Sequence, residues 1–151
     1  MYPNKREAEY QLAKSRKKDH LKLFLKSQYD SRNHFDDMFL MNNSLPEINF
    51  SEVDTRCHFL AKTIDYPIMI NAITGGYPDA SEINRSLAML ANKFNIPMAV
   101  GSQSLGIKYD CSESYQIVRE IMEDQIVIAN VSANSSFDKV KLAVEMIDAN
   151  A

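Results

Sequence analysis

Polar side chains stand directly after three short apolar runs of this chain, at positions where α/β proteins bind ligands. Thr74 follows the run 67–72, Ser102 and Gln103 follow the run 98–100, and Asn130 follows the run 126–129. Because the carboxyl ends of parallel strands meet on one rim, we expect these hydroxyl and amide groups to lie together. Such groups suit the edge of a flat polar heterocycle such as a flavin. The alternative, that each is an ordinary turn or capping residue, stays open.

The glycines support a ligand at this rim. All four of them, Gly75, Gly76, Gly101 and Gly106, lie in or near the first two turns. Glycine accepts positive φ and lets a backbone approach a neighbouring group closely. Their placement therefore predicts a bound group at these turns.

A second constellation is basic and lies near the start of the chain. Arg16 and His20 are four residues apart, so on a helix they share a face that Lys17 flanks. Such a group can hold a diphosphate through charge-assisted hydrogen bonds. The spacing alone favours the alternative, a solvated basic face with a structural histidine. His34 and His58 have no ligand spacing around them and are interpreted as structural or exposed.

The elements that carry these residues follow from hydrophobic periodicity. Residues 10–28 predict a short amphipathic helix with Leu21, Phe24 and Leu25 on one side. Residues 29–60 predict an irregular connection with short strand pieces.

Beyond residue 66 three strand–loop–helix units follow. The run 67–72 is continuously apolar, as in a strand covered on both faces, and a helix follows from Asp79 or Ser81 until Asn95 and Pro97 stop it. Its apolar face should comprise Ile83, Leu87, Leu90, Ala91 and Phe94. The strand 98–100 leads through a loop containing Gly106 to a helix over 112–123. The strand 126–129 precedes a helix capped by Ser136 or Asp138.

Three such units imply parallel strands and an α/β fold. The choice is between a Rossmann-like sheet and part of a (β/α)8 TIM barrel, and the short strands and connections favour the barrel. A complete barrel needs about 250 residues, whereas this chain has 151, so it looks truncated. The predicted organisation is residues 1–60, a basic helix and an irregular or hairpin segment, and residues 61–151, the first three βα units of an incomplete barrel.

Composition excludes several classes of protein. With 45% hydrophobic and 25% charged residues the chain is globular, and without a 20-residue apolar run or an apolar N-terminus we expect a cytoplasmic protein. Cys57 and Cys111 are expected to be free thiols. The fingerprints GxGxxG, GxxxxGK[ST] and GxSxG are absent. Residues 1–28 carry a net charge of +5, which leaves −8 for the remainder, so the basic end could face an anion.

An ordered set of motifs resembles a known family. The segments are RKKDH (16–20), FDD (35–37), NSLPEI (43–48), PIMINAITGG (67–76), EINRSLA (82–88), VGSQ (100–103), YQIVRE (115–120) and IANVSA (128–133). Together they resemble the type 2, FMN-dependent isopentenyl-diphosphate isomerases over nearly the whole chain. The resemblance implies a flavin (β/α)8 barrel that interconverts isopentenyl and dimethylallyl diphosphates, with reduced FMN, Mg²⁺ and NADPH as the usual reductant. It also implies a homo-oligomer of complete barrels that binds neither nucleic acid nor membrane.

The resemblance implies roles for individual residues. Those matching FMN contacts are Ala72, Ile73, Thr74, Ser102 and Asn130, and those matching substrate contacts are Arg16, Lys17, His20, Ser102, Gln103 and Ser104. Ile73 departs from the methionine common in the family, and Ser104 stands at a variable position. The family's metal-binding and catalytic residues belong to later strands, so no residue here is expected to be catalytic or to bind metal. The chain alone is expected to be inactive.

Two alternatives remain. One is another FMN-linked TIM-barrel oxidoreductase, such as a hydroxy-acid oxidase, which needs no diphosphate clamp. The other is a non-enzymatic module whose basic helix docks on nucleic acid or acidic protein. Aromatic side chains are not interleaved with the basic cluster and the net charge is −3, which argues against the second.

Overall fold

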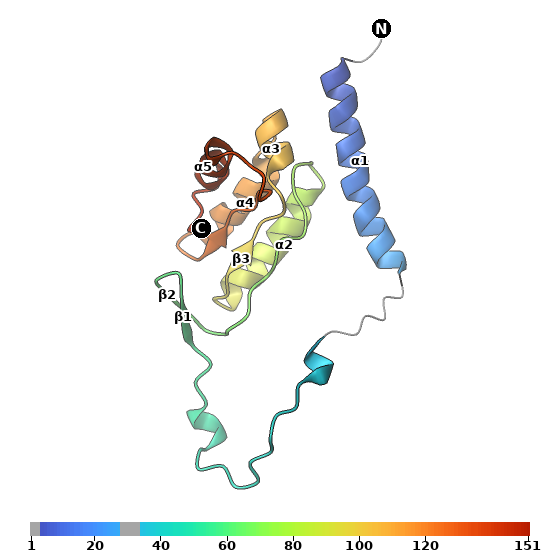
Figure 1. Ribbon diagram of the computed structural model, residues 1–151. Helices are drawn as coiled ribbons and strands as arrows, with labels where there is room; N and C mark the ends of the chain where they lie inside the picture. The colour runs from blue at the N-terminus through green and yellow to red at the C-terminus, as the bar shows by residue number, and fades with distance from the viewer. Residues whose placement is uncertain (1–3, 28–33) are drawn as a thin grey trace.

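A long N-terminal helix, an extended connection and a compact body make up the fold (Figure 1). The computed structural model describes residues 4–27 and 34–151. The predicted end of the first helix at Gln28 and the first part of the predicted connection, 29–33, lie outside the described residues.

The first helix, α1 (Lys5–Lys26), is longer than expected and has no fully buried side chain. The Asn4 side chain caps it by accepting a hydrogen bond from the Arg6 amide at 3.2 Å. Every side chain of α1 keeps contact with solvent, and Leu23, Phe24 and Leu25 are 65–83% exposed. The prediction of a short amphipathic helix was wrong, because Leu12 and Leu23 lie about 180° around the helix from Leu21.

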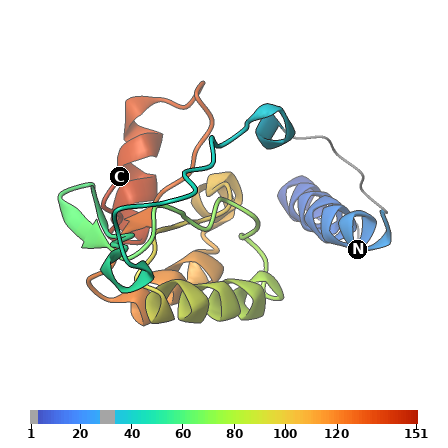
Figure 2. The ribbon, with the colours of Figure 1, turned by 90° about the horizontal axis from the view of Figure 1, so that it is seen from below.

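The connection contains little regular structure, as predicted for its described part. It comprises the 3-10 turns η1 (His34–Asp37) and η2 (Phe50–Glu52) and an antiparallel hairpin of β1 (Cys57–Phe59) and β2 (Lys62–Ile64). Leu60 and Ala61 form the hairpin turn at positive φ. In Figures 1 and 2 the described connection runs from η1 to the hairpin at the edge of the body.

The body is built on parallel pairing. β3 (Met98–Ala99) pairs in parallel with β4 (Val127–Ile128), and Ile70 makes an isolated parallel bridge to Met98. The three apolar runs thus lie side by side in the predicted sense. The run 67–72, however, is not a strand covered on both faces: it makes one bridge, and Ile68 and Met69 are 62% and 40% exposed. The physical reason is that β3 is its only strand neighbour in the described chain.

Helices α2 (Ala80–Lys93), α4 (Glu113–Met122) and α5 (Phe137–Met146) follow the three runs, and α2 packs on α4. The buried core centres on Met98, Val100, Tyr115, Val118, Met122 and Val127. The predicted inner face of α2 was correct for Ala91, which is buried, and for Leu87, which packs against the core, and wrong for Leu90 and Phe94. The buried residues of α2 are Ala80, Asn84, Ala88 and Ala91, while Leu90 and Phe94 are 47% and 40% exposed, because small side chains let α2 approach the body closely.

Local details correct two further predictions. Asp79 occupies the N-cap position of α2 without a side-chain capping bond, and Ser136 does the same for α5. The segment around Gly106 is a short helix, α3 (Ser104–Tyr109), rather than a loop. A Cβ at Gly106 would lie 2.9 Å from the Tyr115 ring, so the glycine there serves packing and does not interrupt the helix.

The last residues lie along the free edge of β4. The Asn150 amide donates to the Val127 carbonyl at 2.8 Å, and the Ala129 amide donates to the Ala151 carbonyl at 2.7 Å. The Arg119 guanidinium holds this segment by donating to the Asp148 carbonyl at 2.7 Å and to Asn150 Oδ1 at 3.0 Å. The sheet therefore follows the order of the chain: the run 67–72, β3, β4 and then the last residues.

Candidate functional site

A groove of about 470 Å³ lies between α1 and the turns at the carboxyl ends of the first two parallel runs. We call it the α1 groove. It is lined by Lys17, His20, Leu21, Phe24, Ala72, Ile73, Thr74 and Ser102. Three segments that are distant in sequence, α1, the turn 72–76 and the turn 101–103, thus meet around one cavity.

Lys17 joins the two turns. Its ammonium donates to the Gly75 carbonyl and, at 3.3 Å, to the Ser102 carbonyl. Burial lowers the pKa of Lys17, and the nearby Cys111 opposes that shift. The ammonium also lies 6.0 Å from the centroid of the Tyr115 ring, within range of a cation–π contact. The groove therefore has a half-buried cation at its wall.

Further polar contacts hold α1 beside the body. Lys18 pairs with Asp79 at 2.5 Å, and Lys108 pairs with Glu9 at 2.9 Å. Arg6 donates to the Lys108 carbonyl at 2.9 Å, and the Tyr10 and Tyr109 rings lie 5.0 Å apart. Exposed ion pairs contribute little to stability, because water and salt screen them.

The glycine turns are close-packed against the protein itself. A Cβ at Gly101 would lie 2.4 Å from the Thr74 carbonyl oxygen, and one at Gly75 would lie 2.1 Å from the Tyr115 ring. Gly76 has φ +82°. Close approach explains these glycines, as expected, but the approaching groups are Tyr115 and the Thr74 backbone. The inference from glycines to a ligand is therefore corrected: they bring two turns together beside the groove.

Tyr115 and Asn84 organise the turns, and sequence analysis gave neither a role in the site. The buried Tyr115 hydroxyl donates to the Ser102 carbonyl at 2.7 Å, and burial raises its pKa. Asn84 Nδ2 donates to the Ser114 carbonyl at 2.6 Å and to the Thr74 carbonyl at 3.3 Å. The Gly76 amide in turn donates to Ser114 Oγ at 2.8 Å. The sequence signal that could have identified Asn84 is its position: an amide side chain on the buried stripe of α2.

The remaining site residues from sequence lie elsewhere. Arg16 is exposed and falls outside the groove lining, since it is about 100° around the helix from Lys17. Gln103 is fully buried: its Nε2 donates to the Ala143 carbonyl at 2.8 Å, and its Oε1 accepts from the Asn130 amide at 2.9 Å. Gln103 thus braces α5 and Asn130, a position that does not match its predicted substrate contact.

Ser104 and Asn130 are not part of the groove lining. Ser104 Oγ lies 3.1 Å from Ser102 Oγ, which does line the groove. The backbone of Asn130 is tied to Gln103 by two hydrogen bonds of 2.9 Å, because its carbonyl also accepts from the Gln103 amide. These bonds join the second and third turns, as the shared-rim prediction requires.

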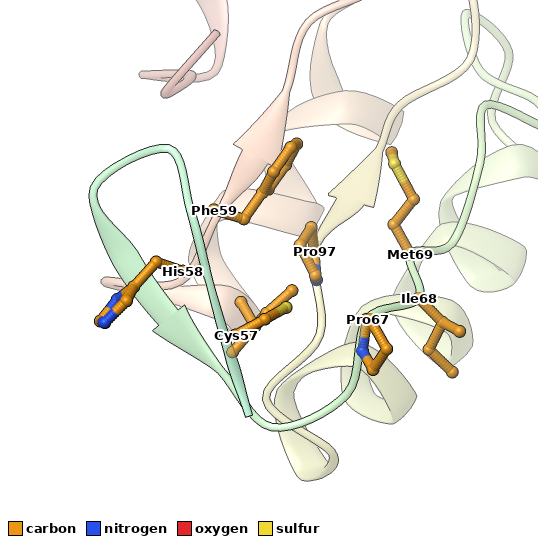
Figure 3. Close-up of a pocket in the computed structure, with 8 residues that line it drawn as sticks. Cys57, His58, Phe59, Pro67, Ile68, Met69 and Pro97 are labelled. Atoms are coloured by element: carbon orange, nitrogen blue, oxygen red, sulfur yellow. The ribbon is translucent and has the colours of Figure 1, made fainter. Parts of the chain in front are cut away.

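A second cavity lies at the amino ends of the parallel runs. It measures about 270 Å³ and is lined by Cys57, His58, Phe59, Ile64, Pro67, Ile68, Met69 and Pro97. Figure 3 shows that the His58 ring points away from Pro67 and Pro97. The lining is apolar and offers little for acid–base chemistry.

The described residues, 4–27 and 34–151, contain no cluster of three or more His, Cys, Asp or Glu side chains placed to hold a metal ion. None of their helices combines the length and apolar character needed to cross a bilayer.

Parallel βα units with a cationic groove at their carboxyl ends are typical of an α/β protein that binds a polar or anionic ligand there. The chain is homologous to curated proteins named isopentenyl-diphosphate delta-isomerase. It is 38% identical over 142 residues to that of Methanothrix thermoacetophila, covering 90% of this chain and 40% of the relative. It is 40% identical over 147 residues to that of Moorella thermoacetica, covering 95% and 42%.

The isomerase of Listeria innocua is 37% identical over 142 residues, covering 93% of this chain and 40% of the relative. The chain therefore spans about two fifths of the length of these curated relatives. No protein-family model matches it.

Proposed function

We propose that this chain forms part of a type 2, FMN-dependent isopentenyl-diphosphate delta-isomerase, and that the α1 groove is one wall of its active site. The observation that carries the proposal is the composition of the groove. Lys17 and His20 from α1, the turn 72–74 and Ser102 line one cavity, although Lys17 and Ala72 are 55 positions apart in the sequence. These are residues that the family resemblance connects with substrate and flavin.

The groove fits the edge of a flavin. Ile73 is 57% exposed and forms no hydrogen bond with any described residue, so its backbone amide is available to a ring carbonyl or nitrogen. A backbone contact also explains how isoleucine can replace methionine at this position. The apolar side chains of Phe24 and Leu21 face the same cavity. FMN, when bound and reduced, would supply the acid–base chemistry at the alkene.

The same groove offers a cation to a diphosphate. The Lys17 ammonium has three N–H donors, two of which serve the Gly75 and Ser102 carbonyls, so one remains. His20 lies one helical turn away on the same wall. Charge-assisted hydrogen bonds from such groups to phosphate oxygens are stronger than neutral ones. In this proposal Lys17 orients the diphosphate and holds the two turns at the correct spacing.

The proposal also covers the metal ion, the complete barrel, its oligomeric state and its reductant. The described residues hold no cluster of three or more His, Cys, Asp or Glu side chains, and the proposal places the Mg²⁺ ligands in the part of the relatives that this chain does not match. We propose that the 61–151 portion supplies three βα units of a TIM barrel and that complete barrels form a homo-oligomer using NADPH as reductant. Since the chain spans about two fifths of its relatives, we expect it to be inactive alone and not to retain FMN at micromolar concentration.

A chimera tests the role of Lys17. This chain replaces the matched 147-residue segment of the Moorella thermoacetica protein, and Lys17→Ala is compared with Lys22→Ala, an exposed lysine of the same helix outside the groove lining. Loss of a charged hydrogen bond should raise KM for isopentenyl diphosphate about 10- to 150-fold, whereas Lys22→Ala should change it less than twofold. Equal KM values would contradict the clamp and favour another FMN-linked barrel oxidoreductase.

A further inference from the structure

The fully buried Tyr115 side chain occupies a slot that three of the four glycines make. A Cβ at Gly75 would lie 2.1 Å from its ring, and one at Gly106 would lie 2.9 Å from the opposite edge of the ring. A Cβ at Gly76 would lie 2.8 Å from its hydroxyl oxygen. A ring packed this closely has one position, because protein interiors leave few voids. Tyr115 therefore sets the course of the first glycine turn.

The hydroxyl of the same residue fixes the second turn. It donates to the Ser102 carbonyl at 2.7 Å, and the Gln103 amide, at the other end of that peptide group, donates to the Asn130 carbonyl at 2.9 Å. Because a peptide group is planar, partners at both ends fix its orientation. That peptide in turn carries the Ser102 side chain, which lines the α1 groove. Tyr115 thus shapes the groove wall from the buried side.

The Lys17 ammonium depends on both of these turns. It donates to the Gly75 and Ser102 carbonyls, the two acceptors whose positions Tyr115 sets. The Ser102 oxygen accepts from Lys17 and from Tyr115, so both of its lone pairs are used. Since an ammonium group is tetrahedral, two fixed N–H bonds determine the direction of the third. The aim of the Lys17 donor that remains for a ligand therefore depends on a residue outside the groove lining.

We propose that Tyr115 is a positioning residue for anion binding in the α1 groove: through the Gly75 and Ser102 carbonyls it aims the third N–H of Lys17 at the anion. That the anion is a diphosphate rests on the proposed function. Phenylalanine keeps the ring in its slot and removes only the donor to Ser102. The contribution of the hydroxyl can therefore be separated from the packing of the ring.

Kinetics of the chimera with the Moorella thermoacetica protein test this role. Tyr115→Phe should raise KM for isopentenyl diphosphate about 3- to 10-fold, because a neutral hydrogen bond is lost, and should change kcat less than about twofold, because the diphosphate is bound alike in substrate and transition state. Ile117→Val removes one methylene group from the core of the same helix, where Ile117 is 8% exposed, and should leave KM and kcat unchanged.

A double-mutant cycle then shows whether Tyr115 acts through Lys17. In a Lys17→Ala background, Tyr115→Phe should raise KM by less than about twofold, because residues that share a partner are not additive. An unchanged KM in Tyr115→Phe alone, or effects of the two substitutions that simply multiply, would overturn the proposal.

A second measurement needs no catalysis. Nitrogen-15 spectra of the lysine ammonium groups in the 151-residue chain report how fast their protons exchange with water. Exchange should be slower for Lys17, which donates to two carbonyls, than for the exposed Lys22. Tyr115→Phe should speed the exchange at Lys17 at least threefold, whereas Ile117→Val should not change it.

Equal exchange at Lys17 in the unchanged chain and in Tyr115→Phe would also overturn the proposal. A chimera that forms no dimethylallyl diphosphate, while the exchange at Lys17 still responds to Tyr115→Phe, would contradict the proposed function and leave the positioning role of Tyr115 standing.

Discussion

The described residues before Ile64, which are 4–27 and 34–63, and residues 64–151 differ in how they are held. In the described chain every buried hydrophobic residue lies at Ile64 or later. The body has a core around Met98 and Tyr115 and glycines that permit contacts closer than a Cβ allows. The described N-terminal part, by contrast, consists of α1, short turns, the β1–β2 hairpin and an exposed segment, residues 38–53, which we call the arm.

The two regions show that helix formation here does not require burial of side chains. α1 forms because its residues favour a helix and Asn4 caps it, although it buries no side chain. It meets the body mainly through long cationic side chains, such as Lys17 and Arg6, which donate to backbone carbonyls. The α1 groove lies at the boundary between the two regions, so its shape depends on these polar contacts.

The largest effect on stability is expected when a methionine of the core, and not one of the arm, is replaced by alanine. Met98 is 1% exposed and Met41 is 97% exposed. Met98→Ala should lower the free energy of unfolding by about 2–5 kcal/mol, because it leaves a cavity, whereas Met41→Ala should change it by less than about 0.5 kcal/mol. Urea unfolding of the 151-residue chain measures both. Similar losses for the two variants would show that the arm is packed and would remove the contrast between the regions.

Gly101→Ala tests the close approach of the two turns. The new Cβ would lie 2.4 Å from the Thr74 carbonyl oxygen, and backbone atoms cannot rotate away. We expect a loss of about 1–3 kcal/mol in the free energy of unfolding. Ser51→Ala in the exposed arm is the control and should stay within about 0.5 kcal/mol. A neutral Gly101→Ala would contradict the tight contact between Gly101 and Thr74.

Tyr115→Phe removes a hydroxyl and keeps the ring against Gly75. Loss of the 2.7 Å bond to the Ser102 carbonyl should lower the free energy of unfolding by about 1 kcal/mol.

The pH dependence of Tyr115 follows from its raised pKa. The folded state holds the phenol proton more tightly than the unfolded state, so the contribution is complete below about pH 10 and is lost as the pH rises further. Urea unfolding at pH 9 and pH 11 should show a smaller decline in Tyr115→Phe than in the unchanged chain. Equal declines would mean that the phenol is not buried.

The smallest effect concerns the exposed contact between α1 and the body. Lys18 and Asp79 form an ion pair whose side chains are 36% and 62% exposed. Lys18→Ala should leave the urea midpoint unchanged at 0.15 M salt, because solvent screens such pairs. A clear shift of the midpoint would show that the exposed ion pair between Lys18 and Asp79 contributes measurably to stability.

The sequence predicted well what depends on short-range pattern. The apolar runs at 98–100 and 126–129 became the parallel pair, and the helix predicted over 112–123 is α4. Periodicity placed Leu87 and Ala91 of α2 correctly but not Leu90 and Phe94, because the contact of α2 with the body depends on small residues such as Ala88. It also misjudged α1, whose apolar residues are distributed around the helix. The division of the chain at residue 60 remains a prediction.

For the site, the sequence named most of the groove lining but not its support. Lys17, His20 and Ser102 were found through residue type and motif, and the structure places them around one cavity. The burial of Gln103 and the bond from Tyr115 to Ser102 could not be predicted, since both arise from contacts between segments at least 13 residues apart. Long-range side-chain contacts leave little trace in local spacing.

The most direct test of the central claim is product formation by the chimera that carries this chain within the Moorella thermoacetica protein. With isopentenyl diphosphate, reduced FMN and Mg²⁺, we predict conversion to dimethylallyl diphosphate with no net oxidation of the flavin. A folded, FMN-loaded chimera that forms no dimethylallyl diphosphate, or that oxidises its flavin once per turnover, would contradict the assignment of the α1 groove to an isomerase.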